Sequence, residues 1–236
     1  MEKKLNGLLK KYKNLNSLIN ELKEENEVIL FGGAVRDYLF LNEFNPRDLD
    51  LVIKFNKDNN LEKYLFKYFS KELIKKNQYD GYKLQLKNMT VDIWALEMTW
   101  GFKKKYFKCD LENLLETVYL NIDSYAYNIT QKKYLNDCNK KMYDEINIKF
   151  KKNLNEELNI FRALVYSKKY EKNLSISILS ELKEIVDSNK NYIEKFMEIQ
   201  EKHYKKNIFD GEKLKKIIEG YLKIYLNFNK ETEVTL

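Results

Sequence analysis

The stretch FGGAVRDYLFLNEFNPRDLDLV, residues 31–52, decides the fold that we expect for this chain of 236 residues. An apolar run over 28–31 predicts a strand that leads into Gly32 and Gly33. A short helix is predicted directly afterwards, over 34–41. A Gly pair between a strand and a helix lets a phosphate approach the bare backbone, and a helix N-terminus favours its negative charge. This end of the stretch therefore predicts a site for a phosphate-bearing ligand.

The other end of the stretch predicts a metal site. Acidic and apolar residues alternate over 48–53, which indicates a strand. Asp48 and Asp50 then project from the same face, about 6.6 Å apart along the strand. Two carboxylates on one face repel each other unless cations lie between them, and hard oxygen ligands suit Mg²⁺. Each motif alone also fits a tight turn followed by an ordinary edge strand, so the prediction depends on finding both in this order.

The combined pattern, GGAVRDYLF followed by DLD, resembles the signature of the polymerase-beta-like nucleotidyltransferase superfamily. It is most similar to the head domain of the bacterial CCA-adding tRNA nucleotidyltransferases and poly(A) polymerases. Leu41 departs from the pattern, since the family usually has Gly there. The resemblance implies metal-holding roles for Asp48 and Asp50 and nucleotide contacts for Gly32, Gly33, Arg36 and Asp37.

A third acid stands in the next pair of predicted strands. Residues 82–86 and 90–96 alternate and are predicted to form a hairpin. Asp92 lies in the middle of the second strand, where an unpaired charge would be unfavourable. If this strand lies beside 48–53, Asp92 completes a cage of three catalytic, metal-binding carboxylates. The resemblance implies such a third acid, and the alternative is a strand residue that faces water.

Residues 111–130 correspond to the second motif of the resembled family, commonly RRDFTINALAYN. The tail matches at 126–128, but Thr-Val-Tyr at 117–119 replaces the Arg-Arg-Asp head, and Asp123 replaces Asn. In the family this motif helps to hold the triphosphate and sugar, which implies nucleotide contacts for Asp123 and Asn128. The loss of the charged head puts ordinary nucleotide binding in question.

A helix predicted over 155–170 resembles the family's neck helix. The resemblance then assigns Glu156 to the acid position, Asn159 to the first Arg and Arg162 to the second. In the family, the acid and the first Arg read the base edges of the incoming CTP and ATP. Asn offers a donor and an acceptor where Arg offers only donors. We therefore expect these three residues to bind nucleotide with altered base selection, the alternative being an exposed helix face.

The predicted fold class is α+β, a small mixed sheet with flanking helices followed by an all-helical part. We expect a nucleotidyltransferase head domain over 1–150 and a helical neck and C-terminal domain over 151–236. A loop is predicted over 97–110, and no strand is expected after about residue 150. Further amphipathic helices are predicted over 2–25, 58–76, 175–187, 190–206 and 210–227.

Composition narrows the class of protein. The chain is 44% hydrophobic and 33% charged, a balance typical of a folded protein, and no apolar run is long enough to span a bilayer. Two cysteines without metal-type spacing predict no disulfide and a reducing, cytoplasmic location. The formal net charge of +7 suits a phosphate-bearing partner, although a biased genome explains a Lys-rich chain equally well.

These features together predict Mg²⁺-dependent transfer of a nucleoside monophosphate from an NTP to an acceptor hydroxyl. An RNA 3′ end, most simply that of tRNA, is the expected acceptor. One alternative is an enzyme of the same fold that modifies a protein or small molecule in a toxin or phage-defence setting. A second alternative is a catalytically inactive RNA-binding module, for which an intact acid cluster would have no use.

Overall fold

The computed structural model describes residues 1–57, 60–135, 144–152 and 155–234, with side chains as far as residue 229. The chain divides into two compact units, which we call the sheet unit (Met1–Val118 and Ile122–Met142) and the helical unit (Tyr119–Asn121 and Tyr143–Leu236). The domain boundary expected at residue 150 stays a prediction, because compactness alone does not show where an independently folding domain ends.

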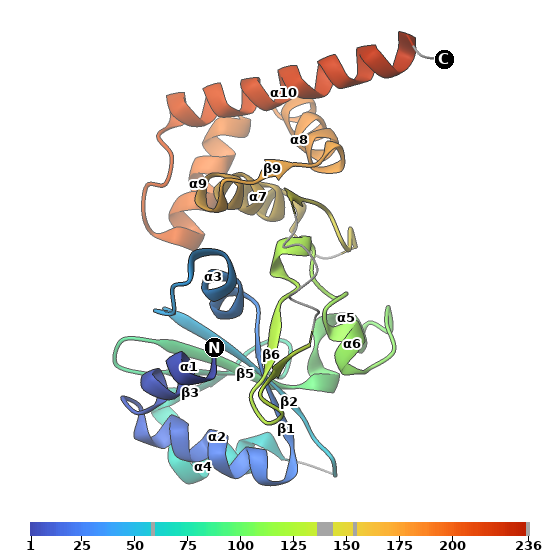
Figure 1. Cartoon of the computed structure of the whole chain (residues 1–236). Helices are drawn as coiled ribbons and strands as arrows, with labels where there is room; N and C mark the ends of the chain where they lie inside the picture. The colour runs from blue at the N-terminus through green and yellow to red at the C-terminus, as the bar shows by residue number, and fades with distance from the viewer. Residues whose placement is uncertain (58–59, 136–143, 153–154, 235–236) are drawn as a thin grey trace. The chain divides into compact units, whose positions relative to one another are not determined.

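A seven-stranded mixed sheet forms the centre of the sheet unit (Figure 1). Its order is β3-β4-β5-β2-β1-β6-β7, and every neighbouring pair is antiparallel except β2 and β5. A parallel pair cannot be joined by a tight hairpin, so the chain crosses over through α4, β3 and β4 before β5. The strands are β1 (Glu27–Phe31), β2 (Asp48–Lys54), β3 (Ile74–Lys76), β4 (Tyr82–Gln85), β5 (Thr90–Ala95), β6 (Ala126–Asn128) and β7 (Lys133–Tyr134).

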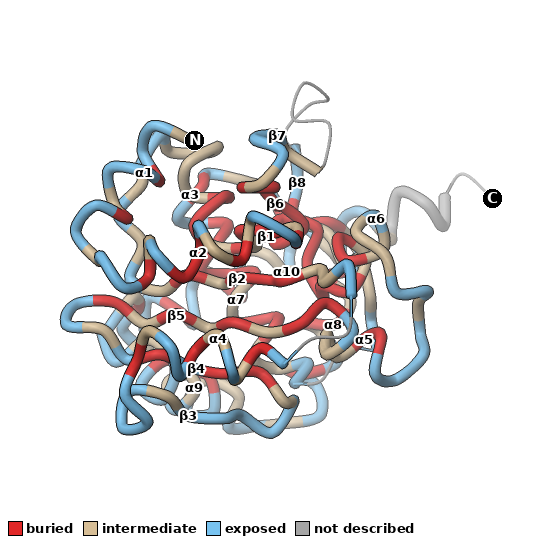
Figure 2. Tube along the Cα trace, turned by 90° about the horizontal axis from the view of Figure 1, so that it is seen from below, coloured by how far each residue is buried: buried red, intermediate tan, exposed pale blue. Residues whose placement is uncertain are grey.

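Alternation along the strands divides the sheet residues between two hydrophobic clusters. Leu49, Leu51 and Val91 belong to the larger cluster, into which the first helices also pack. Ile29 and Val52 belong to a smaller cluster on the other face. Figure 2 shows the buried residues concentrated along β1 and β2. The period of two thus fixes which side chains enter the core and which remain available on the second face.

Helices cover both faces of the sheet. α2 and α4 lie side by side against the larger cluster, and α3 starts directly after β1 (Figure 1). Short helices α5 and α6 contribute to the smaller cluster through Phe102 and Leu114. The helices of this unit are α1 (Glu2–Leu9), α2 (Lys13–Glu25), α3 (Gly33–Leu41), α4 (Leu61–Tyr68), α5 (Trp100–Lys103) and α6 (Leu111–Leu114).

The N-terminal helix differs from the prediction. The apolar period continues through 2–25, but the chain forms two helices that are separated at Lys10–Tyr12. Short i→i−3 bonds, from the Lys11 N–H to the Leu8 carbonyl and from the Tyr12 N–H to the Leu9 carbonyl, close the first helix. Both helices bury their apolar residues in the same cluster, so the break exposes no apolar side chain. The apolar periodicity therefore does not indicate the break.

Residues 58–76 do not form the single helix that their periodicity predicts, and 58–59 lie outside the described residues. α4 ends at Tyr68, and Ile74–Lys76 form strand β3 against β4. The unpaired backbone groups at the edge of β4 form hydrogen bonds with Ile74–Lys76, and this tertiary contact overrides the helical period. The predicted loop over 97–110 likewise contains α5, preceded by one turn of 3₁₀ helix at Leu96–Met98.

The helical unit contains four helices within the part of the chain that the structure describes, and the predicted helix positions are confirmed. They are α7 (Glu156–Tyr170), α8 (Ile176–Ser188), α9 (Tyr192–Tyr204) and α10 (Gly211–Val234). The expectation of an all-helical part is wrong in one detail. β8 (Glu145–Ile146) pairs in parallel with β9 (Asn173–Leu174), a contact between segments too short to show any pattern in sequence.

The predicted elements around the acidic strand are confirmed. The strand, helix and acidic strand of residues 28–53 form as β1, α3 and β2, and the predicted hairpin forms from β4 and β5. Cys109 carries a free, exposed thiol, and Cys138 lies outside the described residues. None of the described helices combines the length and apolar character that crossing a bilayer requires.

Candidate active site

The three acids singled out in the sequence share one face of the central sheet. Asp48 and Asp50 alternate with residues of the larger core cluster, so their side chains lie on the opposite face. In the parallel ladder Asp50 lies directly beside Asp92, and neighbouring strands are about 4.8 Å apart. The structure therefore brings together the carboxylates that the sequence predicted to act together.

Asp48 is held by two donors. The Thr90 hydroxyl donates to Oδ1 of Asp48, and the Arg47 Nε donates to Oδ2 at 2.8 Å. Partial burial opposes ionisation, but these hydrogen bonds outweigh it, and the pKa of Asp48 lies below its usual range. Asp48 is therefore an ionised, acceptor-only group at neutral pH, as a ligand for a hard cation must be.

Asp92 is paired with a cation of the protein itself. Lys83 lies opposite Asp92 in the β4–β5 ladder, with its Nζ 2.9 Å from Oδ2 of Asp92. The Asp92 side chain is only 23% exposed, so this ion pair is partly shielded from water. A metal ion at Asp92 would compete with the Lys83 ammonium for the same carboxylate.

The predicted cage of three carboxylates is not closed. Among the residues that the structure describes, no three His, Cys, Asp or Glu side chains converge closely enough to hold a metal ion. The reason is that Asp48 and Asp92 turn to Arg47, Thr90 and Lys83. The chemistry of the donors still fits a hard cation such as Mg²⁺, since three carboxylates stand on one face of adjacent strands.

The Gly pair lies next to this acid cluster. Gly32 has a φ of +67°, a conformation that favours glycine, and its N–H donates to the Tyr125 carbonyl at 2.8 Å. A Cβ on Gly32 would lie 3.6 Å from Oδ2 of Asp50, so the backbone at the start of α3 approaches the carboxylate. At Gly33 a Cβ would meet only an ordinary contact, so nothing within the chain requires glycine there.

The start of α3 offers the donors that a phosphate needs. The first N–H groups of any α-helix have no partner within the helix, and the helix dipole adds partial positive charge. Arg36 N–H already donates to the Gly32 carbonyl, which leaves the N–H groups of 33–35 at the open end. Backbone donors and carboxylates thus stand together at one end of β2.

Arg36 and Asp123, two of the predicted nucleotide contacts, are paired with each other, and their contact with nucleotide stays a prediction. The Nη1 of Arg36 donates to Oδ1 of Asp123, and both side chains are at most 10% exposed. Asp37 lies on the rim of this pair, 3.5 Å from Nε of Arg36. The ion pair joins α3 to the segment before β6, which are 87 residues apart in sequence.

Asn128 lies on the same face of the sheet as the acids, but toward the other end of β1. Its Nδ2 donates to Glu27 at 2.7 Å, and its Oδ1 accepts the Gln131 N–H at 2.9 Å. Glu27 begins β1, whereas Asp50 pairs with Phe31 at the other end of that strand. Asn128 therefore stabilises the β6–β7 turn, and its predicted contact with nucleotide finds no support in this position.

The replaced head of the second motif is buried. Thr117, Val118 and Tyr119 are each less than 10% exposed, so none of them presents a side chain to a ligand. Within the described residues the Tyr119 hydroxyl has no hydrogen-bond partner. Burial, followed by the negative charges of Glu156 and Glu181, raises the Tyr119 pKa well above its ordinary value.

Two of the predicted neck residues are engaged within α7. Asn159 is buried, and its Oδ1 accepts from Nη1 of Arg162 at 3.2 Å. Arg162 also donates to the Tyr166 hydroxyl, from Nη2 at 2.9 Å and from Nε at 3.2 Å. The Asn that replaces the family's first Arg therefore serves first to orient Arg162.

Glu156 forms a carboxyl pair with Glu181 in the helical unit. The hydrogen bond to Glu181, with burial and its charge, raises the pKa of Glu156 to about 7. For Glu181 burial opposes ionisation, but the bonds from Glu156 and Lys151 prevail and its pKa is lowered. One proton is therefore shared between the two groups near neutral pH.

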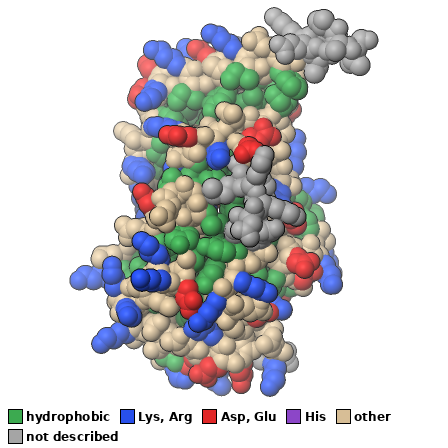
Figure 3. Space-filling view, viewed as in Figure 1, with side chains coloured by type: hydrophobic (Ala, Val, Ile, Leu, Met, Phe, Trp, Pro, Cys, Tyr) green, Lys and Arg blue, Asp and Glu red, His purple; other side chains and the backbone are tan. Residues whose placement is uncertain are grey.

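Sequence reasoning missed the groups that hold the acids. Thr90 lies on the face of Asp92, two residues earlier on the same strand, and alternation would have found it. Lys83 becomes the neighbour of Asp92 once the β4–β5 connection fixes the hairpin register. Figure 3 shows Lys and Arg scattered among Asp and Glu over the face drawn, so the net charge is not gathered into one patch there.

The chain is similar in structure to CCA-adding enzymes. It superposes on a CCA-adding enzyme in complex with ATP with a TM-score of 0.60 and 20% identity, over 92% of this chain and 53% of that chain. A CCA-adding enzyme with CTP gives a TM-score of 0.54 and 16% identity, over 87% of this chain and 51% of that chain. The chain thus spans about half the length of these structures.

At these identities the similarity shows the fold alone, and the predicted α+β fold is confirmed as one shared with CCA-adding enzymes. No protein-family model matches the sequence. No curated protein matches it either. The arguments about activity therefore depend on the geometry of this chain's own residues.

The buried pair of Arg36 and Asp123 predicts a large effect on stability. Asp123→Ala leaves a buried guanidinium without its partner, which should lower the free energy of unfolding by about 3–5 kcal/mol. Arg36→Met combined with Asp123→Leu should recover much of this loss, because both buried charges are removed. Urea unfolding followed by circular dichroism measures both effects.

Asp37→Asn is the matched control for this prediction. Asp37 is 34% exposed and its contact with Arg36 is long, so its loss should cost under about 1 kcal/mol. If Asp123→Ala were no more destabilising than Asp37→Asn, the ion pair would not anchor α3.

The carboxyl pair in the helical unit predicts a titration near neutral pH. In carboxyl ¹³C NMR, Glu156 should titrate with an apparent pKa of about 7, and Glu181→Gln should lower that pKa toward the ordinary value. The folded protein would hold this proton where an unfolded Glu has lost it. Stability should therefore fall as pH rises from the ordinary Glu value to about 7. Glu157→Gln, one residue away, should change neither result, and an unshifted Glu156 would exclude the pair.

Proposed function

We propose that the chain is a nucleotidyltransferase that transfers a nucleoside monophosphate from an NTP to an acceptor hydroxyl with the help of Mg²⁺. An RNA 3′ end, most simply that of a tRNA, is the proposed acceptor. The observation that carries the proposal is the register of β2 with β5, which sets Asp50 beside Asp92 and near the backbone of Gly32. The similarity of fold to CCA-adding enzymes in complex with ATP and CTP supports the choice of an NTP.

The start of α3 would bind the phosphates of the NTP. Its free N–H groups and helix dipole attract an anion, and the absence of side chains at Gly32 and Gly33 allows close approach. Charged side chains contribute less to phosphate binding than the sequence suggested, because Arg36 forms an ion pair with Asp123. Phosphate binding therefore depends mainly on backbone donors.

The carboxylates would serve the transfer itself. The acceptor oxygen forms a bond to the α-phosphorus, and the bond from that phosphorus to pyrophosphate breaks. The proton of the acceptor hydroxyl passes to a base, and we assign this role to the Asp92 carboxylate. Mg²⁺ held by Asp48, Asp50 and Asp92 would supply charge stabilisation to the transferring and leaving phosphates. Lys83 holds Oδ2 of Asp92, so a metal ion or a proton at that oxygen would have to displace the ammonium.

A second acceptor class follows from the same geometry. In the resembled family the second motif helps to hold the triphosphate and sugar, but here its head is buried at 117–119 and Asp123 is paired internally. The residues for holding an ordinary nucleotide are thus reduced, which favours an enzyme that has diverged from RNA substrates. Transfer to a hydroxyl of a protein or small molecule, by the same acids, is the alternative.

Replacing the acids tests the proposal most directly. Asp50→Asn or Asp48→Asn should lower incorporation of labelled NTP into RNA about a thousandfold or more, because charge stabilisation at the transferring phosphate is lost. Chelation of Mg²⁺ should have the same effect. The assay uses tRNA without its CCA end, total RNA and protein substrates in parallel, so that it also identifies the acceptor.

Asp80→Asn is the control for these variants. Asp80 is an exposed acid of the same unit that bridges Lys76 and Lys103, and its loss should change the rate less than twofold. Full activity in a folded Asp50→Asn variant would rule out the site. Absence of transfer to every acceptor tested would favour the inactive RNA-binding module.

Base selection provides an independent test. Asn159 is buried and its Oδ1 is engaged by Arg162, so the pattern of donors that reads cytosine and then adenine is altered. We therefore expect one nucleotide type to be favoured, or loose selection, with few additions per acceptor. Sequencing the 3′ ends after incubation with tRNA, CTP and ATP measures this. Efficient, ordered addition of C, C and A would contradict it.

A further inference from the structure

A turn that carries an aromatic ring among lysines follows α5 in the sheet unit. Its sequence, KKKYFK at 103–108, holds four lysines and no acid. Lys105 has a φ of +57°, a conformation that residues other than glycine adopt infrequently. The N–H groups of Lys105 and Tyr106 donate to carbonyls of α5, at 2.9 and 3.0 Å. These bonds fix the shape of the turn while its side chains at 103–106 stay exposed.

The turn is anchored in the core on both sides. Phe102, before it, is buried in the smaller hydrophobic cluster, and Phe107 packs against the same cluster. A Cβ on Gly101 would lie 2.9 Å from the Thr117 side chain, so α5 approaches that segment as only a glycine allows. The exposed residues of the turn are therefore held in place from both ends.

The smaller cluster occupies the same face of the sheet as the three acids. Val52 belongs to that cluster and lies two residues after Asp50, so both side chains leave β2 on one face. On β5, Trp94 stands in the same relation to Asp92. Nε1 of Trp94 donates to Oγ1 of Thr99, directly before α5, at 3.1 Å. α5 and its turn therefore adjoin the acid cluster on one face of the sheet.

Tyr106 offers an exposed ring on a fixed support. The residue is 42% exposed, and its ring centroid lies 5.4 Å from that of Trp100. This contact restricts the ring, so ordering it against a ligand costs little conformational entropy. Nucleobases stack on exposed aromatic rings with little regard to sequence, because every base has a π-face.

Three lysines of the turn are available to phosphate. Lys104, Lys105 and Lys108 are exposed, and none of them has a carboxylate partner among the residues that the structure describes. The acid that follows them in sequence, Asp110, is engaged as the cap of α6, where it accepts the Asn113 N–H at 2.8 Å. The turn thus keeps a local excess of positive charge.

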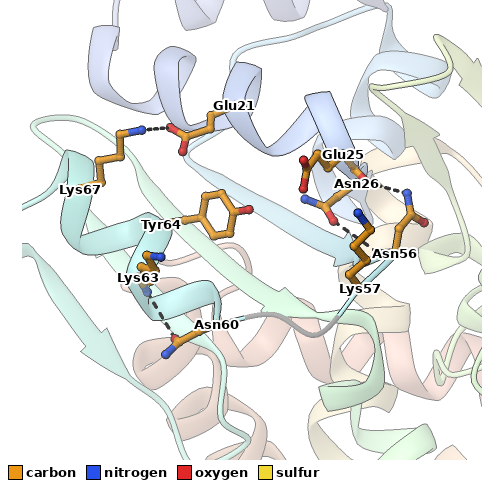
Figure 4. Close-up of a pocket in the computed structure, with 9 residues that line it drawn as sticks. All are labelled: Glu21, Glu25, Asn26, Asn56, Lys57, Asn60, Lys63, Tyr64 and Lys67. Carbon is orange, nitrogen blue, oxygen red and sulfur yellow. Dashed lines mark hydrogen bonds and ion pairs between the residues drawn. The ribbon is translucent and has the colours of Figure 1, made fainter.

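Other lysines of the sheet unit are neutralised by acids. Figure 4 shows Lys67 of α4 directed at Glu21, with their charged atoms 2.7 Å apart. Lys103, where the turn begins, likewise lies 2.6 Å from Asp80. The rest of the turn differs from these places, because its lysines are unpaired and an exposed ring stands among them.

This combination selects a single-stranded nucleic acid among anionic partners. Unpaired lysines attract any polyanion, so charge alone does not separate a nucleic acid from an acidic peptide. A ring among the lysines favours a partner whose charges alternate with flat bases. The bases of a duplex are already stacked on one another, whereas those of a single strand can stack on the ring.

We propose that the turn at 103–108 is a docking surface for the single-stranded 3′ region of the acceptor RNA. A base stacks on Tyr106, and the three unpaired lysines contact the neighbouring phosphates. A strand bound there can lead its end along the same face of the sheet to the acid cluster. The choice of RNA rests on the proposed function, but binding at the turn uses none of the carboxylates.

A single-stranded RNA of about 12 nucleotides, carrying a fluorescent label, is the probe. Fluorescence anisotropy measures its binding to the full chain, without NTP and with a chelator. Tyr106→Ala should weaken binding at least about fivefold, because a stacked base loses its support. Tyr106→Phe keeps the ring and should bind as the wild type does. Phe66→Ala is the matched control, since Phe66 is 41% exposed but lies on α4 against the larger cluster, and it should leave binding unchanged.

The salt dependence of binding tests the lysines separately. Each phosphate contact contributes about −0.7 to the slope of log K against log salt for a single strand. Lys104→Gln combined with Lys105→Gln should therefore reduce the slope by about 1.4, whereas Tyr106→Ala should not change it. Lys10→Gln with Lys11→Gln, an exposed pair directly after α1, should leave the slope unchanged. Thermal melting verifies that each variant is folded.

The proposal would be wrong if the chain did not bind the RNA, or if either control variant weakened binding as much as its counterpart in the turn. Equal or tighter binding of duplex RNA or of polyglutamate would also overturn it, since the ring would then have no role. The outcome is separate from that of the proposed function. Binding through the turn without incorporation of NTP would leave the surface standing and exclude the transferase, and normal RNA affinity in an active Tyr106→Ala variant would do the reverse.

Discussion

The parallel pairing of β2 with β5 is the constraint on which the candidate active site depends. It sets Asp50 beside Asp92 and Thr90 beside Asp48, although about 35 residues of chain connect the two strands. Burial of Leu49 and Val91 in the larger cluster fixes this register. A slip of one residue would turn the carboxylates into the core and expose the leucines and valines, which is unfavourable on both counts. Apolar residues buried on one face of the sheet thus position the carboxylates on the other face.

Much of the charge that the sequence offers for ligands is used within the protein. Arg36 forms an ion pair with Asp123, and Lys83 forms one with Asp92. Arg162 donates hydrogen bonds to side chains of its own helix. A buried or partly buried charge is tolerated only with a partner, so this pairing follows from where the fold places these side chains. Under the proposed function, phosphate recognition would therefore depend on the backbone at the start of α3. Backbone donors bind phosphate without regard to the base.

The two ends of β2 carry different chemistry. Its first residues present ionised carboxylates, and Val52, further along the same face, packs into the smaller cluster with residues of α5. A rigid strand whose ends emerge from a tightly packed core thus places the acids beside the turn that follows α5. The overall fold is shared with CCA-adding enzymes.

The sequence by itself determined the elements whose pattern is local. The Gly pair before a helix, the alternation around Asp48 and Asp50, the β4–β5 hairpin and helix α7 all follow from periodicity and turn chemistry within some twenty residues. Only the tertiary structure decided the pairing of Arg36 with Asp123 and of Asn128 with Glu27, since each joins segments far apart in the chain. It also decided the break at Lys10–Tyr12 and the strand at Ile74–Lys76, where packing and a sheet edge override the helical period. The physical reason is that periodicity reports which face is buried, whereas partners of charged groups and sheet edges are set by segments that meet only on folding.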